Sequence, residues 1–254
     1  MFGTCTFRTG ISVFFLLQLA LMPIGAQETI QTSQGDLIIH PVQHATFVMS
    51  WNNQTIYVDP VGGKDAFSSY DQPDLILITD IHGDHLDIDT LQAIVTDQTN
   101  LIAPQAVADK LSGQLKEKTR VMKNGETSES NGISIEAIPM YNITRDRLRY
   151  HEKGRGNGYV LTLGDKRVYI SGDTEDIPEM RVLKDIDVAF ICMNLPYTMT
   201  VDQAADAVKE FKPGIVYPYH YRGSDVQAFQ EMVESDTEVD VRLLDWYQEQ
   251  SSVK

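Results

Sequence analysis

The segment Asp74–Thr79 leads directly into a cluster of ionisable side chains, and this junction constrains the fold more than any other part of the sequence. Between its two polar ends the segment reads Leu-Ile-Leu-Ile, and Pro73 precedes it. A strand with one face in water alternates apolar and polar residues, whereas a strand that is buried on both faces is apolar throughout. Strands of the second kind occur in sheets that helices cover, so the junction predicts an α/β fold.

The rest of the chain alternates short β-rich segments with amphipathic helical ones, which is the pattern of an α/β sandwich. Only residues 141–157 form a long irregular stretch, and no linker divides the sequence, so we expect a single domain. The expected strands cover residues 36–41, 45–51, 54–59, 74–79, 101–103, 133–139, 159–163, 167–171, 188–193, 215–219 and 239–244, and the expected helices cover 87–96, 106–115, 201–211 and 226–233.

The first 26 residues have the composition of an export signal. Arg8 is their one charged side chain. The apolar run Ile11–Met22 is too short to cross a bilayer core of about 30 Å. The small residues Gly25-Ala26 suit cleavage before the next residue. We therefore predict a signal peptide at 1–26, a mature domain at 27–254, and a periplasmic or secreted protein without stable membrane insertion; an uncleaved anchor is the alternative.

The balance of charge argues against one class of partner. Lys and Arg number 21 and Asp and Glu 36, which gives a formal net charge of −15. A field of this sign repels the phosphates of nucleic acids and the head groups of anionic lipids. We therefore expect a small-molecule substrate and no nucleic-acid partner, while the sequence leaves the oligomeric state open.

Four potential metal ligands, Asp80, His82, Asp84 and His85, fall within six residues directly after the expected strand at 74–79. Imidazole and carboxylate groups together suit Zn²⁺, Mn²⁺ or Fe. An exposed polar turn with helix-capping aspartates is the alternative. Two further candidates also follow expected strands, where functional side chains are commonly placed. They are Asp173 and His220.

The sequence contains the motifs His44-Ala-Thr-Phe, Val58-Asp-Pro60, residues 79–85, Ser171-Gly-Asp-Thr174 and Pro218-Tyr-His-Tyr221. These motifs resemble those of the metallo-β-lactamase-fold hydrolases. Some features are closer to the branch that contains ascorbate-6-phosphate lactonase: Gly158-Tyr159, Ile177-Pro-Glu-Met180 and Tyr197-Thr-Met199. The resemblance implies a single-domain αββα sandwich with a metal site at one edge, between two sheets.

The same resemblance implies a ligand set for one or two divalent ions, zinc or manganese. Asp80, His82 and Asn142 would face the first ion, Asp84, His85 and His220 would face the second, and Asp173 would lie between them. Asp80 and Asn142 stand where the family has histidines, and their oxygen donors make the first site harder, which favours Mn²⁺, Mg²⁺ or Ca²⁺ over Zn²⁺ there. The first site could also be empty.

His151 follows Asn142 by nine residues, and we expect it either to replace the missing ligand or to be an exposed loop residue. His44 is expected beside the site or in the core, without binding an ion. Five basic residues lie within positions 145–155. We expect Arg147 and Arg149, with His151, to bind an anionic substrate, because guanidinium groups suit phosphate and carboxylate. Ion pairing with nearby acids is the alternative for these arginines.

The predicted function is that of an exported metal-dependent hydrolase. A bound metal lowers the pKa of water to about 7, so a metal-bound hydroxide can attack near neutral pH. The expected substrate is a lactone, ester or phosphoester of a small anion, with Asp84 and His85 as the catalytic residues and Asp84 orienting the water. Two alternatives are a degenerate family member that binds a small anion or metal without turnover, and a phosphodiesterase that acts on lipid or nucleotide.

Overall fold

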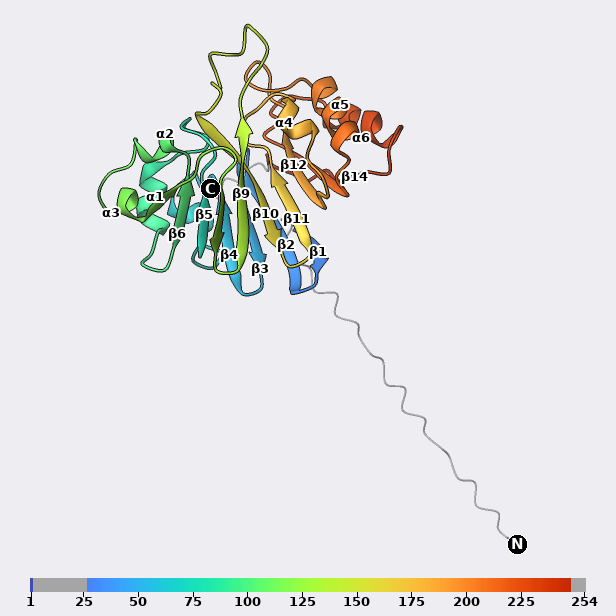
Figure 1. Ribbon diagram of the computed structural model, residues 1–254. Helices are drawn as coiled ribbons and strands as arrows, with labels where there is room; N and C mark the ends of the chain where they lie inside the picture. Colours follow the sequence, from blue (N-terminus) through green and yellow to red (C-terminus); the bar gives the residue numbers. More distant parts are fainter. Residues whose placement is uncertain (2–26, 248–254) are drawn as a thin grey trace, which may run out of the picture.

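Two seven-stranded sheets pack against each other, and helices cover their outer faces (Figure 1). The computed structural model describes residue 1 and residues 27–247. The first sheet contains β1 (Glu28–Thr32), β2 (Gly35–Gln43), β3 (Thr46–Trp51), β4 (Gln54–Val58), β5 (Leu75–Leu77), β6 (Asn100–Ala103) and β7 (Thr119–Val121), in that order. The second contains β8 (Thr127–Ser130), β9 (Ile133–Met140), β10 (Gly156–Leu163), β11 (Lys166–Ile170), β12 (Val188–Cys192), β13 (Ile215–Tyr219) and β14 (Asp240–Val241), also in chain order.

The helices divide between the two sheets according to their place in the sequence (Figure 1). The 3₁₀ helix η1 (Lys64–Phe67) and helices α1 (Ile88–Ile94), α2 (Gln105–Ala108) and α3 (Gly113–Lys118) belong to the first half, and α4 (Pro178–Arg181), α5 (Val201–Phe211) and α6 (Val226–Glu234) belong to the second. The predicted αββα sandwich in one domain is therefore confirmed. The core lies between the sheets, where the ring of Phe47 in β3 stacks on that of Phe190 in β12 at 4.4 Å.

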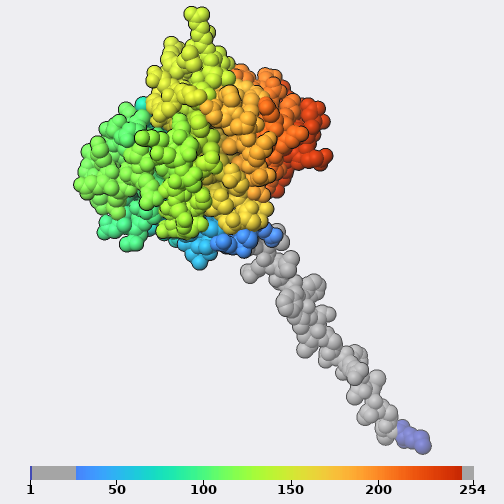
Figure 2. All heavy atoms as spheres, in the orientation of Figure 1, coloured from blue at the N-terminus to red at the C-terminus, as the bar shows by residue number. Residues whose placement is uncertain are grey.

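Each sheet is antiparallel over its early strands and parallel over its later ones. Strands β4 to β7 run parallel in the first sheet, and β11 to β14 run parallel in the second. Parallel neighbours end at the same edge of a sheet, so the residues that follow β5, β11 and β13 come together there. The long connection from β9 to β10, residues 141–155, rises above the rest of the surface at this edge (Figures 1 and 2).

Helix α5 shows how closely the sequence pattern can define an element. Its apolar side chains recur at helical spacing and are buried, and it covers the range that the sequence predicts. Thr200 and Gln203 form a reciprocal capping box at its start. Lys212 ends the helix in the left-handed conformation, directly before Pro213.

The helix predicted over 106–115 is wrong, because the structure has two short helices there, α2 and α3. Ser112 lies between them with an extended backbone, φ −139° and ψ 167°, and Gly113 at the start of α3 has a φ of 54°, so one continuous α-helix cannot cover this range. Strands β1, β7 and β8 are not among the predicted elements; β7 and β8 lie at sheet edges and show no buried apolar run. The predicted signal peptide at 1–26 lies outside the described residues, apart from residue 1. Within residues 27–247, no helix combines the length and apolar character needed to cross a membrane.

Candidate metal centre

A cluster of imidazoles and carboxylates occupies the edge where the parallel strands end. Asp84 and His85 come from the turn after β5, Asp173 from the turn after β11, and His220 from the residue that follows β13. We call these four residues the Asp173 group. A second set, which we call the Asp80 group, consists of Asp80, His82 and His151 and lies beside the first.

Asp173 is the centre of the first group. Its Oδ2 lies 3.2 Å from the Nε2 atoms of both His85 and His151, and its Oδ1 lies 3.4 Å from Nε2 of His220. Two ligands bound to one tetrahedral metal at about 2.1 Å are roughly 3.4 Å apart, so the observed spacing is that of atoms that share an ion. Burial alone would raise the pKa of the Asp173 carboxyl, but the imidazoles of His220 and His85 hold it well below its usual range.

Several of these atoms are buried and have no hydrogen-bond partner among the described residues: Nε2 of His85, Nε2 of His151 and Oδ1 of Asp173. Buried polar atoms are nearly always paired, and atoms left unpaired in this way suggest an ion or ligand. The pKa of His85 points to the same conclusion. Burial alone would lower it, but the carboxylates of Asp173 and Asp59 raise it well above its ordinary value, so the site favours positive charge. The residues present therefore fit a divalent metal ion.

The ring of His85 is fixed by a partner on its far side. Its Nδ1 lies 2.8 Å from Oδ2 of Asp59, a fully buried carboxylate that also accepts hydrogen bonds from the backbone and hydroxyl of Thr79. A carboxylate that accepts a hydrogen bond from Nδ1 fixes the ring and leaves Nε2 as the atom that faces the centre, which is the usual support of a metal-binding histidine. His151 is held in a similar way, because its Nδ1 donates to the backbone carbonyl of Tyr197 at 3.1 Å.

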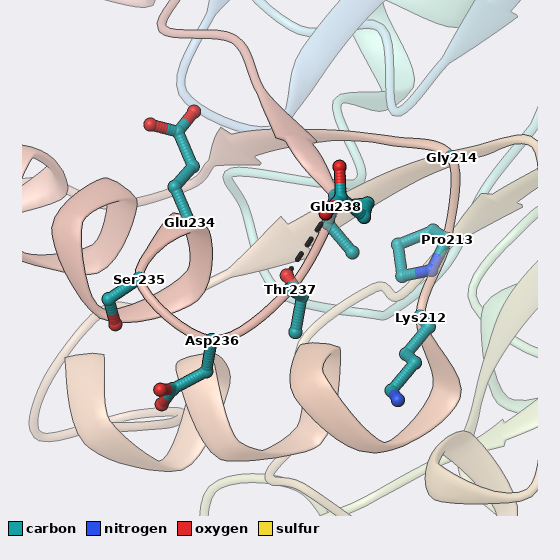
Figure 3. Close-up of a pocket in the computed structure, with 9 residues that line it drawn as sticks. Lys212, Pro213, Gly214, Glu234, Ser235, Asp236, Thr237 and Glu238 are labelled. Atoms are coloured by element: carbon teal, nitrogen blue, oxygen red, sulfur yellow. Dashed lines mark hydrogen bonds between the residues drawn. The ribbon is translucent and has the colours of Figure 1, made fainter.

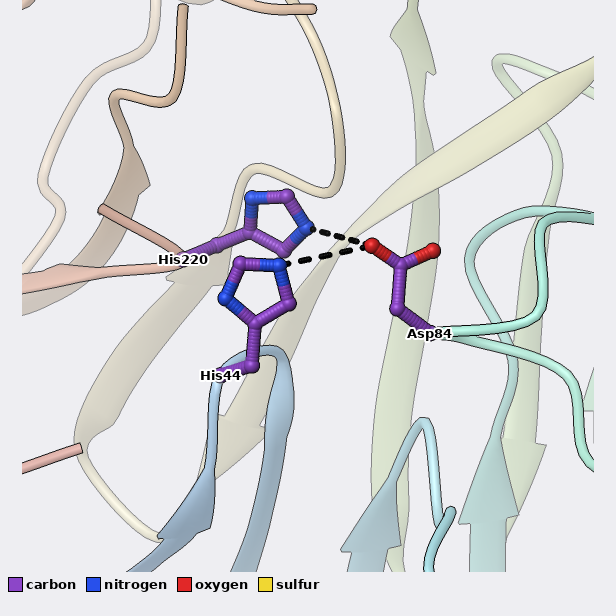
Figure 4. Close-up of side chains that lie close together, drawn as sticks. All are labelled: His44, Asp84 and His220. Carbon is purple, nitrogen blue, oxygen red and sulfur yellow. Dashed lines mark hydrogen bonds and ion pairs between the residues drawn. The ribbon is translucent and has the colours of Figure 1, made fainter. Parts of the chain in front are cut away.

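Asp84 is the most exposed acid of the centre, with 43% of its side chain accessible. Figure 4 shows the imidazoles of His44 and His220 directed at the same oxygen, Oδ2 of Asp84, at 3.4 and 3.3 Å. Burial alone would raise the pKa of Asp84, but hydrogen bonds from His220 and His44 lower it far more, so the carboxylate is ionised. The ionised carboxylate of Asp84 can thus accept a hydrogen bond from a water molecule on the solvent side.

His44 contacts Asp84 and His220 of the Asp173 group, where the sequence led us to expect a position beside the site or in the core. Its ring stacks on that of His220 at 3.7 Å, and its Nδ1 lies 2.7 Å from the hydroxyl of Tyr247. His44 and His220 both have positive φ angles, 49° and 48°, and the backbone nitrogen of His220 donates to the carbonyl of His44. Such backbone conformations are costly for side chains other than glycine and cluster at functional sites.

The Asp80 group has a different surrounding. Asp80 is buried, and Arg155 donates to both of its oxygens, from Nε to Oδ1 at 3.0 Å and from Nη2 to Oδ2 at 2.8 Å. The same Oδ2 lies 2.8 Å from Nδ1 of His82 and 3.8 Å from Nε2 of His151. Sequence reasoning missed the pairing with Arg155, although this arginine belongs to the basic run that it noted.

One backbone hydrogen bond joins Asn142 to His151 within the connection from β9 to β10. The nitrogen of Asn142 donates to the carbonyl of His151 at 2.9 Å, and its side-chain Nδ2 donates to the carbonyls of Arg147 and Tyr197. The side-chain amide therefore supports the loop that brings His151 to Asp173. The side-chain Oδ1 of Asn142 is buried and has no hydrogen-bond partner among the described residues, and the predicted role of Asn142 as a metal ligand stays a prediction.

The two arginines predicted to bind substrate have different positions. Arg147 is tied to Glu175, to the carbonyl of Thr198 and to Gln203, so the structure favours the ion-pair alternative for this residue. Arg149 lies on the surface, with its guanidinium 4.8 Å from the centre of the Tyr150 ring.

A cavity of about 550 Å³ opens over the metal centre. Tyr150, Tyr197 and Leu195 form part of its wall together with Arg222, and Asp84, His151 and His220 line it at the metal centre. A second hollow of about 670 Å³ lies at the other end of β13 (Figure 3). Its charged lining residues are Glu234, Asp236, Glu238 and Lys212, and it contains no imidazole, so it is not the site of the chemistry.

The two helix-covered sheets and the imidazole–carboxylate cluster at their shared edge define a metal-dependent hydrolase of the metallo-β-lactamase fold. The chain belongs to the beta-lactamase superfamily domain family, whose sequence profile matches residues 39–220. Its homologues carry the name metal-dependent hydrolase, and the chain is an enzyme of this superfamily.

Relatives support the family over most of the chain. A UPF0173 metal-dependent hydrolase of Methanopyrus kandleri is 30% identical over 188 residues, which cover 70% of this chain and 81% of that protein. A UPF0173 metal-dependent hydrolase of Pyrococcus horikoshii is 29% identical over 210 residues, covering 77% and 92%. A solved structure from Parabacteroides distasonis superposes with a TM-score of 0.79 at 42% identity and covers 86% of this chain and 98% of its own.

Proposed function

We propose that the protein is an exported hydrolase that uses one or two divalent ions, zinc or manganese, to cleave a lactone, ester or phosphoester bond in a small anionic molecule. The observation that carries the proposal is a set of buried atoms on His85, His151 and Asp173 that have no hydrogen-bond partner within residues 27–247 and converge below an open cavity. The branch resembling ascorbate-6-phosphate lactonase and the export signal at 1–26 are parts of the same proposal, supported by sequence motifs.

The Asp173 group would hold an ion through Asp84, His85, Asp173 and His220. When bound, a divalent ion supplies Lewis acidity and makes water acidic enough to lose a proton near neutral pH. Asp59 keeps the Nε2 lone pair of His85 directed into the centre, which is the orientation that ion binding requires.

Asp84 receives the proton of the attacking water in this proposal. Its carboxylate is ionised, partly exposed to the cavity, and held by His44 and His220 through Oδ2, which leaves Oδ1 directed elsewhere. General-base catalysis needs such a group within hydrogen-bond reach of the proton that it takes. The hydroxyl of Tyr247 fixes the ring of His44, and His44 in turn fixes Asp84.

The cavity wall supports a small anionic substrate with an apolar part. Tyr150 and Tyr197 pack edge to face at 5.0 Å, and Tyr197 and Leu195 are each about half exposed at 46% and 49%. Arg222 adds a positive charge at the same wall of an otherwise acidic protein. An aromatic pair with a nearby guanidinium suits an apolar group next to a carboxylate or phosphate.

The test compares the purified protein with His85→Asn and with His40→Asn as a matched control. His40 lies outside the centre, beside the Tyr70 ring. Each protein is loaded with Zn²⁺ or Mn²⁺, its metal content is measured, and it is screened on γ-lactones, aryl esters, phosphomonoesters and phosphodiesters with and without a carboxylate. We expect metal-dependent turnover of anionic lactones, esters or phosphomonoesters, lost in His85→Asn and kept in His40→Asn.

Other outcomes would replace the proposal with a stated alternative. Turnover of phosphodiesters alone would make the protein a phosphodiesterase. Stoichiometric metal binding without turnover of any class would make it a degenerate, binding member of the family. Equal metal content and activity in His85→Asn and the unaltered protein would remove the assigned site.

A further inference from the structure

Arg155 forms the one arginine fork in the described part of the metal centre. Its Nε and Nη2 pair with the two oxygens of Asp80, and Nη2 also donates to the carbonyl of Tyr150. The side chain of Asp80 is fully buried and that of Arg155 is 17% exposed. Asp80 is the one carboxylate of the Asp80 group, and both of its oxygens therefore accept hydrogen bonds from a positively charged guanidinium.

The backbone next to Arg155 is held close to the end of β5. The nitrogen of Asn157 donates to the carbonyl of Thr79 at 3.0 Å, which joins the start of β10 to the residue before Asp80. Gly156 permits the approach, because a Cβ atom there would lie 2.9 Å from that carbonyl and 2.3 Å from Cε of Met140. The guanidinium thus reaches Asp80 from an anchored backbone and not from a free loop.

The two groups consequently offer an ion different electrostatic surroundings. In the Asp173 group, Asp84 and Asp173 face imidazoles, and no described lysine or arginine forms an ion pair with either. In the Asp80 group, the guanidinium contacts the same Oδ2 atom that His82 approaches to 2.8 Å. A fixed positive charge next to a cation site repels the cation and competes for its carboxylate ligand.

We infer that Arg155 makes the centre asymmetric: the Asp173 group binds one divalent ion tightly, and the Asp80 group binds a second at least about tenfold more weakly because Arg155 neutralises Asp80. The inference rests on one part of the proposed function, namely that the centre binds metal. In this arrangement the guanidinium supplies the positive charge that a second ion would bring to Asp80.

The test measures metal binding to the full chain and does not depend on turnover. Metal-free protein is titrated with Zn²⁺ and with Mn²⁺ by calorimetry, and the metal kept after dialysis is counted by elemental analysis. We expect one retained ion per chain in the unaltered protein. In Arg155→Gln the weaker step should tighten about tenfold or more, and the retained count should rise from one towards two.

The matched control is Arg149→Gln, which removes an exposed guanidinium from the same loop and should leave both steps unchanged. A second variant keeps the inference testable if Arg155→Gln fails to fold. Asp80→His combined with Arg155→Gln removes both members of the buried ion pair and supplies an imidazole in place of the carboxylate, so it should bind two ions tightly.

Three results would overturn the inference. They are two equally tight ions in the unaltered protein, an unchanged weaker step in Arg155→Gln, and weaker binding in that variant, which would make Arg155 a support for Asp80 as a ligand. A chain that binds no metal in any variant would instead overturn the proposed function, so the two failures are distinguishable.

Discussion

The Asp173 group and the Asp80 group lie side by side at the same edge, yet their charges are balanced by different means. Asp173 faces three imidazoles, of which that of His151 comes from the Asp80 group, and Nε2 of His85 and Oδ1 of Asp173 have no hydrogen-bond partner among the described residues. Asp80 contacts the imidazole of His82 and accepts two hydrogen bonds from the guanidinium of Arg155. One group is complete only when a cation joins it, whereas the other already contains a cation of its own.

This difference shows that the fold fixes the position of the site, while a few side chains determine the charge at each of its two groups. The positions after β5, β11 and β13 still converge because the parallel strands end together. The two groups differ in their donor atoms, and only Asp80 is contacted by an arginine, Arg155, from the connection between β9 and β10. The fold determines where the chemistry takes place, and the loop determines how many charges meet there.

The largest expected effect comes from Asp173→Asn. The amide keeps the volume but removes the negative charge shared by three imidazoles, so the tightly bound ion should be lost and turnover should fall by about a thousandfold or more. Elemental analysis and the best substrate of the screen check this. Asp185→Asn, an exposed acid before β12, is the control with the same charge change. Retention of the ion in Asp173→Asn would contradict the central place given to this residue.

A smaller effect is expected from Asp59→Asn, which acts on the ion only through His85. An amide at this position can present its NH₂ group to Nδ1, and the Nε2 lone pair of His85 would then no longer be secured. Loss of such a supporting carboxylate costs about 10- to 100-fold in metal affinity. Calorimetric titration with Zn²⁺ measures the change, and the step assigned to the Asp80 group should be affected much less. An equal loss in both steps would mean that Asp59 acts on the whole fold.

Two residues of the Asp173 group are predictable from sequence because they closely follow apolar strands. A residue one to three positions beyond a strand has little freedom, so the end of the strand places it. Asp173 and His220 are examples. The two-sheet fold is predictable for the same reason, since its buried strands are strongly apolar.

Arg155 and His151 are harder to place because they belong to an irregular connection. Asp80 and Arg155 are 75 positions apart, and their pairing depends on the bond from Asn157 to Thr79, which no periodicity reveals. His44 is difficult for another reason: its position depends on a left-handed backbone at the β2–β3 turn. Hydrophobic patterns in the sequence indicate which residues are buried. They do not predict the Asp80–Arg155 pair or the position of His44, because both depend on backbone geometry.

The connection that carries His151 should also respond to pH through Glu175. Burial alone would raise the pKa of this carboxyl, but hydrogen bonds from Thr144 and Ile143 and the charge of Arg147 lower it below its usual range. A depressed pKa stabilises the folded state above the unfolded value of about 4.3, and this stability is lost as the pH falls through the lower, folded value.

Glu175→Gln should therefore lower the free energy of unfolding by about 1–3 kcal/mol at pH 7 and by progressively less below about pH 4. Chemical denaturation of metal-free protein across this range measures the difference. Glu179→Gln removes a more exposed ion pair of the same loop, with Lys153, and should cost less at every pH. A difference between Glu175→Gln and the unaltered protein that stays constant from pH 7 to pH 3 would contradict the charge-based account.

The smallest expected effect concerns the cavity wall and not the ion. Arg222 is exposed, so its attraction for an anion is screened and worth at most about 1 kcal/mol, or roughly fivefold in affinity. Arg222→Gln should raise KM by a few-fold for an anionic ester and leave kcat and the metal content unchanged. Its neutral analogue, the corresponding methyl ester, should show no change. At 1 M salt the Debye length falls to about 3 Å, and the difference between the two substrates should disappear. Equal rises in KM for the charged and neutral substrates would instead mean that Arg222 shapes the wall, through its position over the Tyr247 ring at 5.9 Å.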